Sequence, residues 1–328
     1  MNKRTFLSMA AAAALGIVLG HAAPGGALAQ AKKFKVGISL PDAQNPFYVA
    51  MSKSIMKTFA ENGMDATLLM AYADVNEQVS QIDDLVAAKV DAILVSPLDT
   101  QGPAHALRRA HEAGIPIFMV ARTLDAKYKE IWKAYVGFDY RQVGQMDGKW
   151  AVENLKPGNI AMLLGPAGAM VAVDMEKGFR EEVEKAGFKV VWAQNSTLTR
   201  ENGLKLAEDA LVAHPDVVAI YAMNDDLALG AAQAVKARGK TKDIATLGMN
   251  GAPTALAAIH NGDLSMTIML DPVGWGKAAA QMVADYLVKR KEPPALHEPF
   301  VPEVVTQKNA YEKIPEPLRE KLGVKPRS

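Results

Sequence analysis

Residues 35–63 read KVGISLPDAQNPFYVAMSKSIMKTFAENG, and the order of patterns in this stretch decides the fold. The first six residues are a short apolar run with β-branched members, which predicts a strand. A helical pattern follows from Pro46 to Asn62, and Gly63 ends it, because glycine adopts the left-handed conformation that closes a helix at little cost. A strand that leads directly into a helix is the repeating unit of α/β proteins.

The same alternation continues along the next sixty residues. Strands are predicted over 66–72, 91–96 and 115–120, and helices over 76–89 and 102–113, the last ended by Gly114. The strands are continuous apolar runs, which indicates burial on both faces of a parallel sheet. Single helices between parallel strands imply right-handed crossovers.

The order then restarts. Strands are predicted over 159–165, 189–194, 217–223 and 243–249, and helices over 172–186, 201–213 and 226–238. The two passes predict an α/β protein of two doubly wound lobes with parallel sheets. Ligands of such sheets bind beyond the carboxyl ends of the strands, so two facing lobes can line one cleft and close around a ligand by a hinge motion.

Residues 1–29 have the pattern of a secretory signal peptide. Lys3 and Arg4 precede an apolar run over 6–19, and Ala27-Leu28-Ala29 supplies small residues for cleavage after Ala29, with a second site after Ala31. A membrane anchor is the weaker alternative, because the run is short and rich in alanine. We therefore expect the mature chain in the periplasm.

The amino-acid composition narrows the class of protein further. The chain has no cysteine, so it has neither a lipid-attachment site nor disulfides. Residues 1–29 hold two basic and no acidic residues, so without them the formal net charge falls from +1 to −1. This charge does not have the basic excess that is typical of nucleic-acid-binding proteins. The remaining length allows two domains of ordinary size.

Catalytic, metal and cofactor motifs are weak or missing in the sequence. It contains no His-Glu-x-x-His and no Gly-x-Ser-x-Gly pattern. Gly165-Pro166-Ala167-Gly168 follows a strand as a phosphate loop does, but it lacks the Lys-Ser/Thr pair and is better interpreted as a tight turn. We expect a binding protein without cofactor or metal.

Polar and aromatic residues instead gather at the predicted strand ends. Asn45, followed by Phe47 and Tyr48, comes after the first strand. Asn45 suits either a helix N-cap or ligand binding. Phe47 suits either the core or a stacking surface for a sugar.

Three more such residues follow other strands. Arg122 follows the strand over 115–120 and is either a surface charge or a donor to ligand hydroxyls or a carboxylate. Asn224 begins Asn224-Asp225-Asp226, where the alternative to a ligand contact is helix capping by Asp225 or Asp226, and Asn250 follows another strand. Neutral amides with one arginine suit a hydroxylated, uncharged ligand, because each amide both donates and accepts.

Several motifs together resemble the ribose-binding type of periplasmic sugar-binding proteins, which have the type I fold. The motifs are Asn45-Pro46-Phe47-Tyr48, Val136-Gly137-Phe138-Asp139-Tyr140, Ala213-His214-Pro215-Asp216-Val217, Ala222-Met223-Asn224-Asp225-Asp226-Leu227-Ala228-Leu229-Gly230 and Gly248-Met249-Asn250-Gly251. The resemblance implies ligand contacts at Asn45, Phe47, Tyr48, Arg122, Asn224 and Asn250.

The resemblance also implies three crossovers between the lobes. They fall near Phe138-Asp139, Leu270-Asp271 and Val301-Pro302, which makes Phe138, Asp139, Asp271 and Pro302 hinge residues. Lobe one then comprises residues 32–138 and 271–301, and lobe two comprises 139–270 and 302–328.

The sequence departs from the ribose-binding pattern at five positions that the resemblance places in the cleft. Ala121 replaces an aspartate, Val173 an arginine, Leu198 a phenylalanine, Asn250 an aspartate and Leu270 a glutamine. The loss of carboxylates argues against ribose itself. A more apolar cleft favours a deoxy sugar, a small polyol or a non-sugar ligand.

The sequence thus predicts a monomeric solute-binding protein of an ABC importer, with a membrane permease as its partner. A component that presents a signal molecule to a sensor is the alternative. The signal peptide argues against a third hypothesis, the effector core of a sugar-responsive repressor, and the missing catalytic groups argue against an enzyme on this fold.

Overall fold

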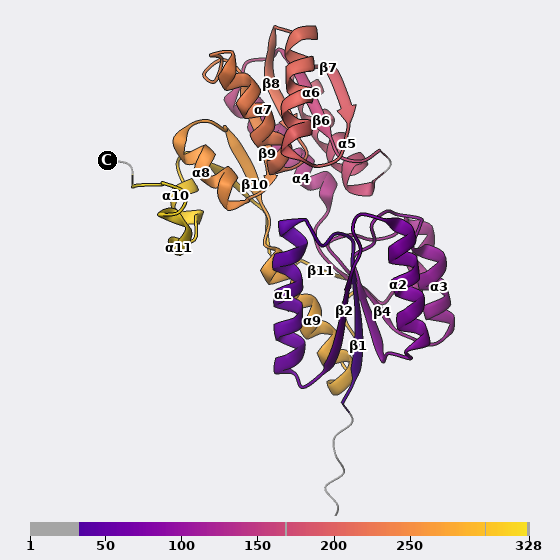
Figure 1. The fold of residues 1–328 in the computed structure, drawn as a ribbon. Helices are drawn as coiled ribbons and strands as arrows, with labels where there is room; N and C mark the ends of the chain where they lie inside the picture. The colour runs from indigo at the N-terminus through magenta and orange to yellow at the C-terminus, as the bar shows by residue number, and fades with distance from the viewer. Residues whose placement is uncertain (1–32, 168, 299, 327–328) are drawn as a thin grey trace, which may run out of the picture. The chain divides into compact units, whose positions relative to one another are not determined.

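The computed structural model describes residues 33–167, 169–298 and 300–326, so the predicted signal peptide lies outside the described residues. Its first sheet has the strand order β11-β5-β4-β3-β1-β2, with every pair parallel (Figure 1). The strands are β1 (Lys35–Leu40), β2 (Asp65–Met70), β3 (Ala92–Val95), β4 (Ile117–Val120), β5 (Ala134–Val136) and β11 (Leu296–His297).

Helices cover both faces of this sheet. Helices α1 (Pro46–Glu61) and α9 (Pro272–Lys289) pack together on one face, and α2 (Val75–Ala87) packs with α3 (Ala104–Glu112) on the other (Figure 1). A 3-10 helix, Ala126–Ile131, precedes β5. Every residue of β3 and β4 is buried, which confirms the prediction from their continuous apolar runs.

The second sheet has the order β12-β10-β9-β8-β6-β7, and only the pair of β10 and β12 is antiparallel. Its strands are β6 (Asn159–Leu164), β7 (Lys189–Asn195), β8 (Val217–Ala222), β9 (Ala245–Asn250), β10 (Met266–Met269) and β12 (Glu303–Thr306). The first five strands of each sheet follow the same spatial order, 2-1-3-4-5, which confirms two doubly wound passes.

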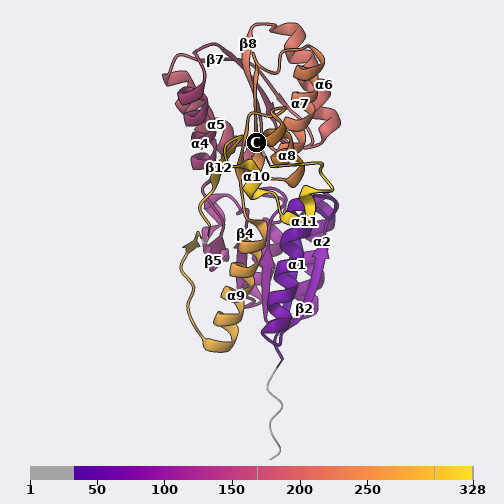
Figure 2. The ribbon, with the colours of Figure 1, turned by 90° about the vertical axis from the view of Figure 1, so that its left-hand side faces the viewer.

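Five helices flank the second sheet. On one side α4 (Tyr140–Asn154) packs with α5 (Met170–Lys185), and on the other lie α6 (Arg200–Ala213), α7 (Asp225–Ala237) and α8 (Pro253–Asn261) (Figure 2). A Cβ on Gly144 of α4 would lie 2.1 Å from the carbonyl oxygen of Met175, so glycine permits the close contact with α5. The tail helices α10 (Ala310–Lys313) and α11 (Glu316–Arg319) follow β12. The carbonyl oxygen of Lys325 in the tail lies 2.8 Å from Nε2 of His260.

The chain passes between the two sheets three times: from β5 to α4, from β10 to α9, and from β11 to β12. All strands of the first sheet lie within the residues assigned to lobe one, and all strands of the second within lobe two. Asp139 caps α4 by accepting from Arg141 N at 2.9 Å, and Asp271 caps α9 by accepting from Gly274 N at 2.8 Å. Both passages into a helix therefore begin with an aspartate N-cap.

Candidate functional site

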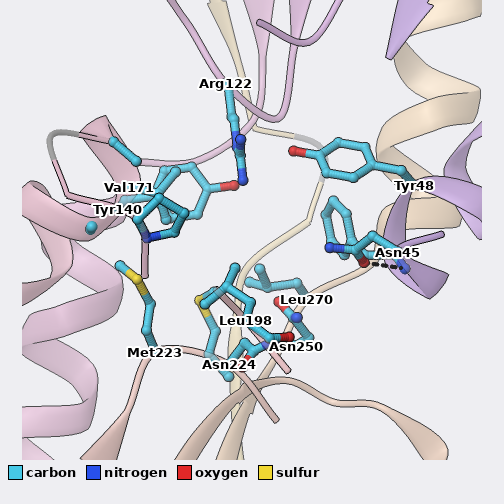
Figure 3. Close-up of a pocket in the computed structure, with 15 residues that line it drawn as sticks. Asn45, Tyr48, Arg122, Tyr140, Val171, Leu198, Met223, Asn224, Asn250 and Leu270 are labelled. Carbon is cyan, nitrogen blue, oxygen red and sulfur yellow. Dashed lines mark hydrogen bonds between the residues drawn. The ribbon is translucent and has the colours of Figure 1, made fainter. Parts of the chain in front are cut away.

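A pocket lies at the carboxyl ends of strands from both sheets (Figure 3). It contains about 520 Å³ of empty space, part of which is open to solvent. The lining residues are Asn45, Phe47, Tyr48, Arg122, Tyr140, Pro166, Ala169, Val171, Ala172, Leu198, Met223, Asn224, Met249, Asn250 and Leu270. The structure thus brings together eight of the ten residues that the sequence predicted for ligand binding, all except Ala121 and Val173.

Asn45 enters the pocket from the start of α1. Its Oδ1 accepts a hydrogen bond from Phe47 N at 3.0 Å, so this residue is a helix N-cap as well as part of the lining. The Phe47 ring packs edge-on against Tyr48 at 5.3 Å and against the buried Trp275 at 5.9 Å between centroids. This packing fixes the aromatic side of the pocket.

Arg122 follows β4 after an unusual turn. Ala121 has φ of +60°, and Arg122 N donates to Val120 O at 2.7 Å, which closes a three-residue turn. The guanidinium donates to Leu98 O through Nη1 at 3.0 Å and lies 5.6 Å from the Tyr48 ring centroid. Figure 3 shows this side chain pointing between the hydroxyl groups of Tyr48 and Tyr140.

Ala121 itself is fully buried behind the lining, which corrects its prediction as a cleft residue. Its contribution is the positive φ, which is costly for a residue with a Cβ and directs the next residue into the pocket. The hydroxyl of Tyr135 lies 3.2 Å from Ala121 O and 3.1 Å from Phe138 O, and it accepts from Phe138 N at 3.2 Å. Tyr135 thereby joins the Arg122 turn to the first crossover.

Asn224 begins α7 on the opposite side of the pocket. Its Oδ1 accepts from Leu227 N at 2.9 Å, so Asn224 itself is the helix N-cap, where the sequence had suggested Asp225 or Asp226. Its Nδ2 lies 3.4 Å from Leu198 O, a long hydrogen bond to the loop after β7. Because Oδ1 is used by the helix, Nδ2 is the atom of this side chain with capacity to bind a ligand oxygen.

Asn250 ends β9 in a strained conformation, with φ of +123°, and Gly251 follows at +73°. The Asn250 carbonyl accepts from Leu270 N at 3.2 Å, which holds the second crossover against this turn. Strained backbone at a pocket persists only where neighbouring interactions impose it.

The carboxylate of Asp225 supplies those interactions. Its Oδ1 accepts from Thr267 Oγ1 at 2.7 Å and its Oδ2 from Ala252 N at 2.6 Å. A Cβ on Gly248 would lie 2.6 Å from Asp225 Oδ1, so glycine permits this approach. Asp225 thus joins the ends of β8, β9 and β10, which carry Asn224, Asn250 and Leu270 into the pocket.

Burial raises the pKa of Asp225 to about 7, although the hydrogen bonds from Thr267 and Ala252 lower it. Burial, and then the nearby charge of Asp225, raise the pKa of Asp147 well above its ordinary value. Among the described residues, neither carboxyl oxygen of Asp147 has a hydrogen-bond partner. The raised pKa favours the protonated form of Asp147.

An apolar wall completes the pocket on the side of lobe two. It consists of Ala169, Val171, Ala172, Leu198, Met223 and Met249. Val173, predicted for the cleft, is 52% exposed on a different face of α5, because a residue two positions from Val171 cannot share its helical face. The apolar character of this wall agrees with the expectation, but the residues that provide it were partly misassigned.

Tyr140 is the polar lining residue that sequence reasoning missed. It begins α4 just after the predicted hinge, and its side chain is only 5% exposed. Burial raises the pKa of its hydroxyl well above the ordinary value, so the group is neutral at physiological pH. Its place one residue after the Asp139 cap was the available signal.

Within the described residues no cluster of three His, Cys, Asp or Glu side chains is arranged to hold a metal ion. The helices of that same part of the chain include none that combines the length and the apolar character needed to cross a membrane.

Two α/β sheets whose strand ends share one polar pocket define a solute-binding protein of the two-lobed class. Residues 36–291 match the family described as periplasmic binding protein domain, and this chain belongs to that family. The ribose import binding protein RbsB of Bacillus subtilis is 32% identical over 270 residues, which are 82% of this chain and 87% of that protein. The galactofuranose-binding protein YtfQ of Escherichia coli is 29% identical, over 91% of this chain and 93% of its own.

Solved structures agree with these relatives. The periplasmic binding protein of the arabinose ABC transporter from Shewanella sp. ANA-3, solved with α- and β-L-arabinofuranose, superposes with a TM-score of 0.81. It is 27% identical, and the match covers 90% of this chain and 99% of that one. The type I periplasmic binding protein fold that the sequence predicted is thereby confirmed.

Proposed function

We propose that this protein is the exported binding component of an ABC importer and that it binds a small carbohydrate-like ligand in the pocket. The observation that carries the proposal is the convergence of Asn45, Arg122, Asn224 and Asn250 from four strand ends on one pocket. Amide and guanidinium groups supply directed hydrogen bonds to ligand oxygens, while Phe47 offers an apolar face. Family membership and the sugar-binding relatives support the same function.

Closure of the two lobes on the ligand follows from this proposal. The pocket lining comes from both sheets, so a ligand that contacts both sides favours the closed arrangement. Phe138, Asp139, Asp271 and Pro302 lie in the connections between the sheets and are the proposed hinge residues. The closed form would then dock on a membrane permease.

Export, cleavage and oligomeric state are also part of this proposal. Residues 1–29 direct export to the periplasm and are removed, and the mature protein acts as a monomer. It carries out no catalysis, and its pocket serves binding and release.

The deciding experiment is a thermal-shift screen of the chain without residues 1–29, refolded to remove any carried ligand. The screen covers pentoses, hexoses, deoxy sugars, polyols and small acids. A ligand at ~1,000 times its Kd stabilises the folded state by roughly 4 kcal/mol, which raises Tm by several degrees for a chain of this size. A hit among the sugars or polyols supports the proposal, and no shift with any compound contradicts it.

The pocket assignment has its own test. Asn224→Ala and Asn250→Ala should each weaken ligand binding about tenfold or more, because each removes directed hydrogen bonds worth about 1.5 kcal/mol. Isothermal titration calorimetry with the best ligand of the screen measures the change. Asn202→Ala on α6 is the matched control, because Asn202 is outside the pocket lining. Unchanged affinity in both pocket variants would remove this pocket as the binding site.

A further inference from the structure

The charge of the pocket is concentrated in one side chain. Arg122 is the charged member of the fifteen described lining residues, and the others are amides, tyrosines and apolar side chains. Its partners in the described chain are the carbonyl of Leu98, at 3.0 Å, and the Tyr48 ring, at 5.6 Å from the centroid. Both are neutral, so the positive charge faces the pocket without a protein carboxylate bound to it.

An acidic side chain that lines the adjoining hollow is already hydrogen-bonded to the backbone. Asp99 shares a small neighbouring hollow with Arg122, but its Oδ1 accepts from Gln101 N at 2.8 Å and from Gly102 N. This carboxylate caps the turn before α3 and forms no ion pair with Arg122 in the described residues. The side chain of Arg122 is held in place by contacts that leave its charge uncompensated.

Closure of the lobes around a ligand increases the need of Arg122 for a negatively charged partner. An arginine that loses water on closure is stabilised best by a carboxylate, which accepts two parallel hydrogen bonds from the guanidinium. A neutral ligand leaves the buried charge with neutral acceptors alone, which is costly in a site of low dielectric constant. The preference of the pocket for a carboxylate over a neutral ligand therefore grows as the pocket becomes more enclosed.

The rest of the lining fits the remainder of such a ligand. The side-chain amides of Asn45, Asn224 and Asn250 line the pocket, with Asn224 and Asn250 next to each other in Figure 3, and they can bind hydroxyl groups. Val171 and Met223 lie on another side in Figure 3, where a carbon skeleton can pack. The lining thus separates one cationic position, several neutral polar positions and one apolar wall.

We propose that the preferred ligand is a small polyhydroxylated carboxylic acid, a sugar acid, whose carboxylate binds Arg122 while its hydroxyls bind the three asparagines. This inference rests on the proposed function and specifies the ligand of the same pocket. It departs from the uncharged ligand that the sequence predicted from the amides and one arginine, because the structure shows how Arg122 is partnered.

The test compares acids with their neutral counterparts on the refolded mature protein. The probes are the pairs D-ribonate and D-ribose, D-galactonate and D-galactose, and D-gluconate and D-glucose, titrated by calorimetry at neutral pH and low salt. We expect at least one acid to bind about tenfold or more tightly than its neutral partner, and added salt to weaken the acid more than the sugar.

Variants at Arg122 test the assignment of the carboxylate. Arg122→Gln should remove most of the preference for the acid, and Arg122→Lys should retain part of it, because lysine keeps the charge but loses the paired hydrogen bonds. Arg109→Gln is the control, since Arg109 is on α3 and pairs with Asp83 at 2.7 Å outside the pocket. Thermal unfolding without ligand verifies that each variant is folded.

The outcomes separate this inference from the proposed function. Neutral sugars that bind as tightly as the acids overturn the sugar-acid ligand and leave a carbohydrate-binding protein. A preference for acids that survives in Arg122→Gln also overturns the assignment. If no acid and no sugar binds to the folded protein, both the inference and the proposed function fail.

Discussion

At the scale of single residues, several pocket side chains have both a structural and a binding position. Asn45 and Asn224 are helix N-caps that also line the pocket. For Asn45 the sequence presented capping and ligand binding as alternatives, but one amide can cap with its oxygen and bind with its nitrogen. We therefore expect the loss of either side chain to lower stability and, under the proposed function, affinity as well.

Asn250 allows these two effects to be separated. Because its φ of +123° is strained for a residue with a Cβ, Asn250→Gly should keep or raise thermal stability by up to about 1 kcal/mol while it weakens ligand binding. Asn250→Ala should weaken binding equally without the gain in stability. Thermal unfolding of both ligand-free variants is the measurement, and equal melting temperatures would show that the turn is not strained.

At the scale of elements, the pocket depends on the joined ends of β8, β9 and β10. Asp225, Thr267 and Ala252 connect them through hydrogen bonds of 2.6 and 2.7 Å. The sequence predicted most of the first-pass elements within a few residues, such as the helix at 46–62 that is observed as Pro46–Glu61. It did not predict α4, whose face toward α5 combines Gly144 and Gly148 and whose buried positions include Asp147, because that composition conceals the amphipathic pattern.

The raised pKa of Asp225 predicts a dependence of stability on pH. In the unfolded chain this carboxyl titrates near its ordinary value, whereas in the folded protein its pKa is about 7. The folded state therefore binds the extra proton, and the free energy of unfolding falls as the pH rises from about 4 to about 7, by up to ~1.4 kcal/mol per pH unit. Burial of Asp147 acts in the same direction.

The Asp225→Asn variant measures how much of this pH dependence of stability comes from the Asp225 carboxyl. The variant should show a shallower fall in Tm between about pH 4 and about pH 7 than the wild type does, because its side chain does not titrate. Asp209→Asn is the matched control, since Asp209 is an exposed residue of α6. An unchanged slope in Asp225→Asn would contradict the assigned pKa.

At the scale of the whole molecule, three chain passages connect two sheets of the same strand order. Tyr135 links the first passage to the pocket. Its hydroxyl contacts Phe138 in that passage and the carbonyl of Ala121, whose turn positions Arg122. Under the proposed function, a residue of lobe one thus connects the proposed ligand contact at Arg122 with the proposed hinge at Phe138.

Removal of the Tyr135 hydroxyl should therefore affect both stability and ligand binding. Tyr135→Phe leaves Phe138 N without its acceptor and should lower the free energy of unfolding by about 1–3 kcal/mol. It should also weaken ligand binding, because the turn before Arg122 loses a contact. Chemical denaturation and calorimetry measure the two effects, and Tyr128→Phe, on the 3-10 helix away from the pocket, is the control. Unchanged affinity would separate Tyr135 from the site.

The sequence by itself determined the α/β class, the two passes and the approximate set of pocket residues. These features depend on local pattern, since buried parallel strands are continuously apolar and functional residues follow their carboxyl ends. Only the tertiary structure decided which residues of α5 face the pocket, that Ala121 acts through its backbone, and that Tyr140 joins the lining. A one-residue change along a helix rotates a side chain by about 100°, so sequence alignment without packing cannot fix these positions.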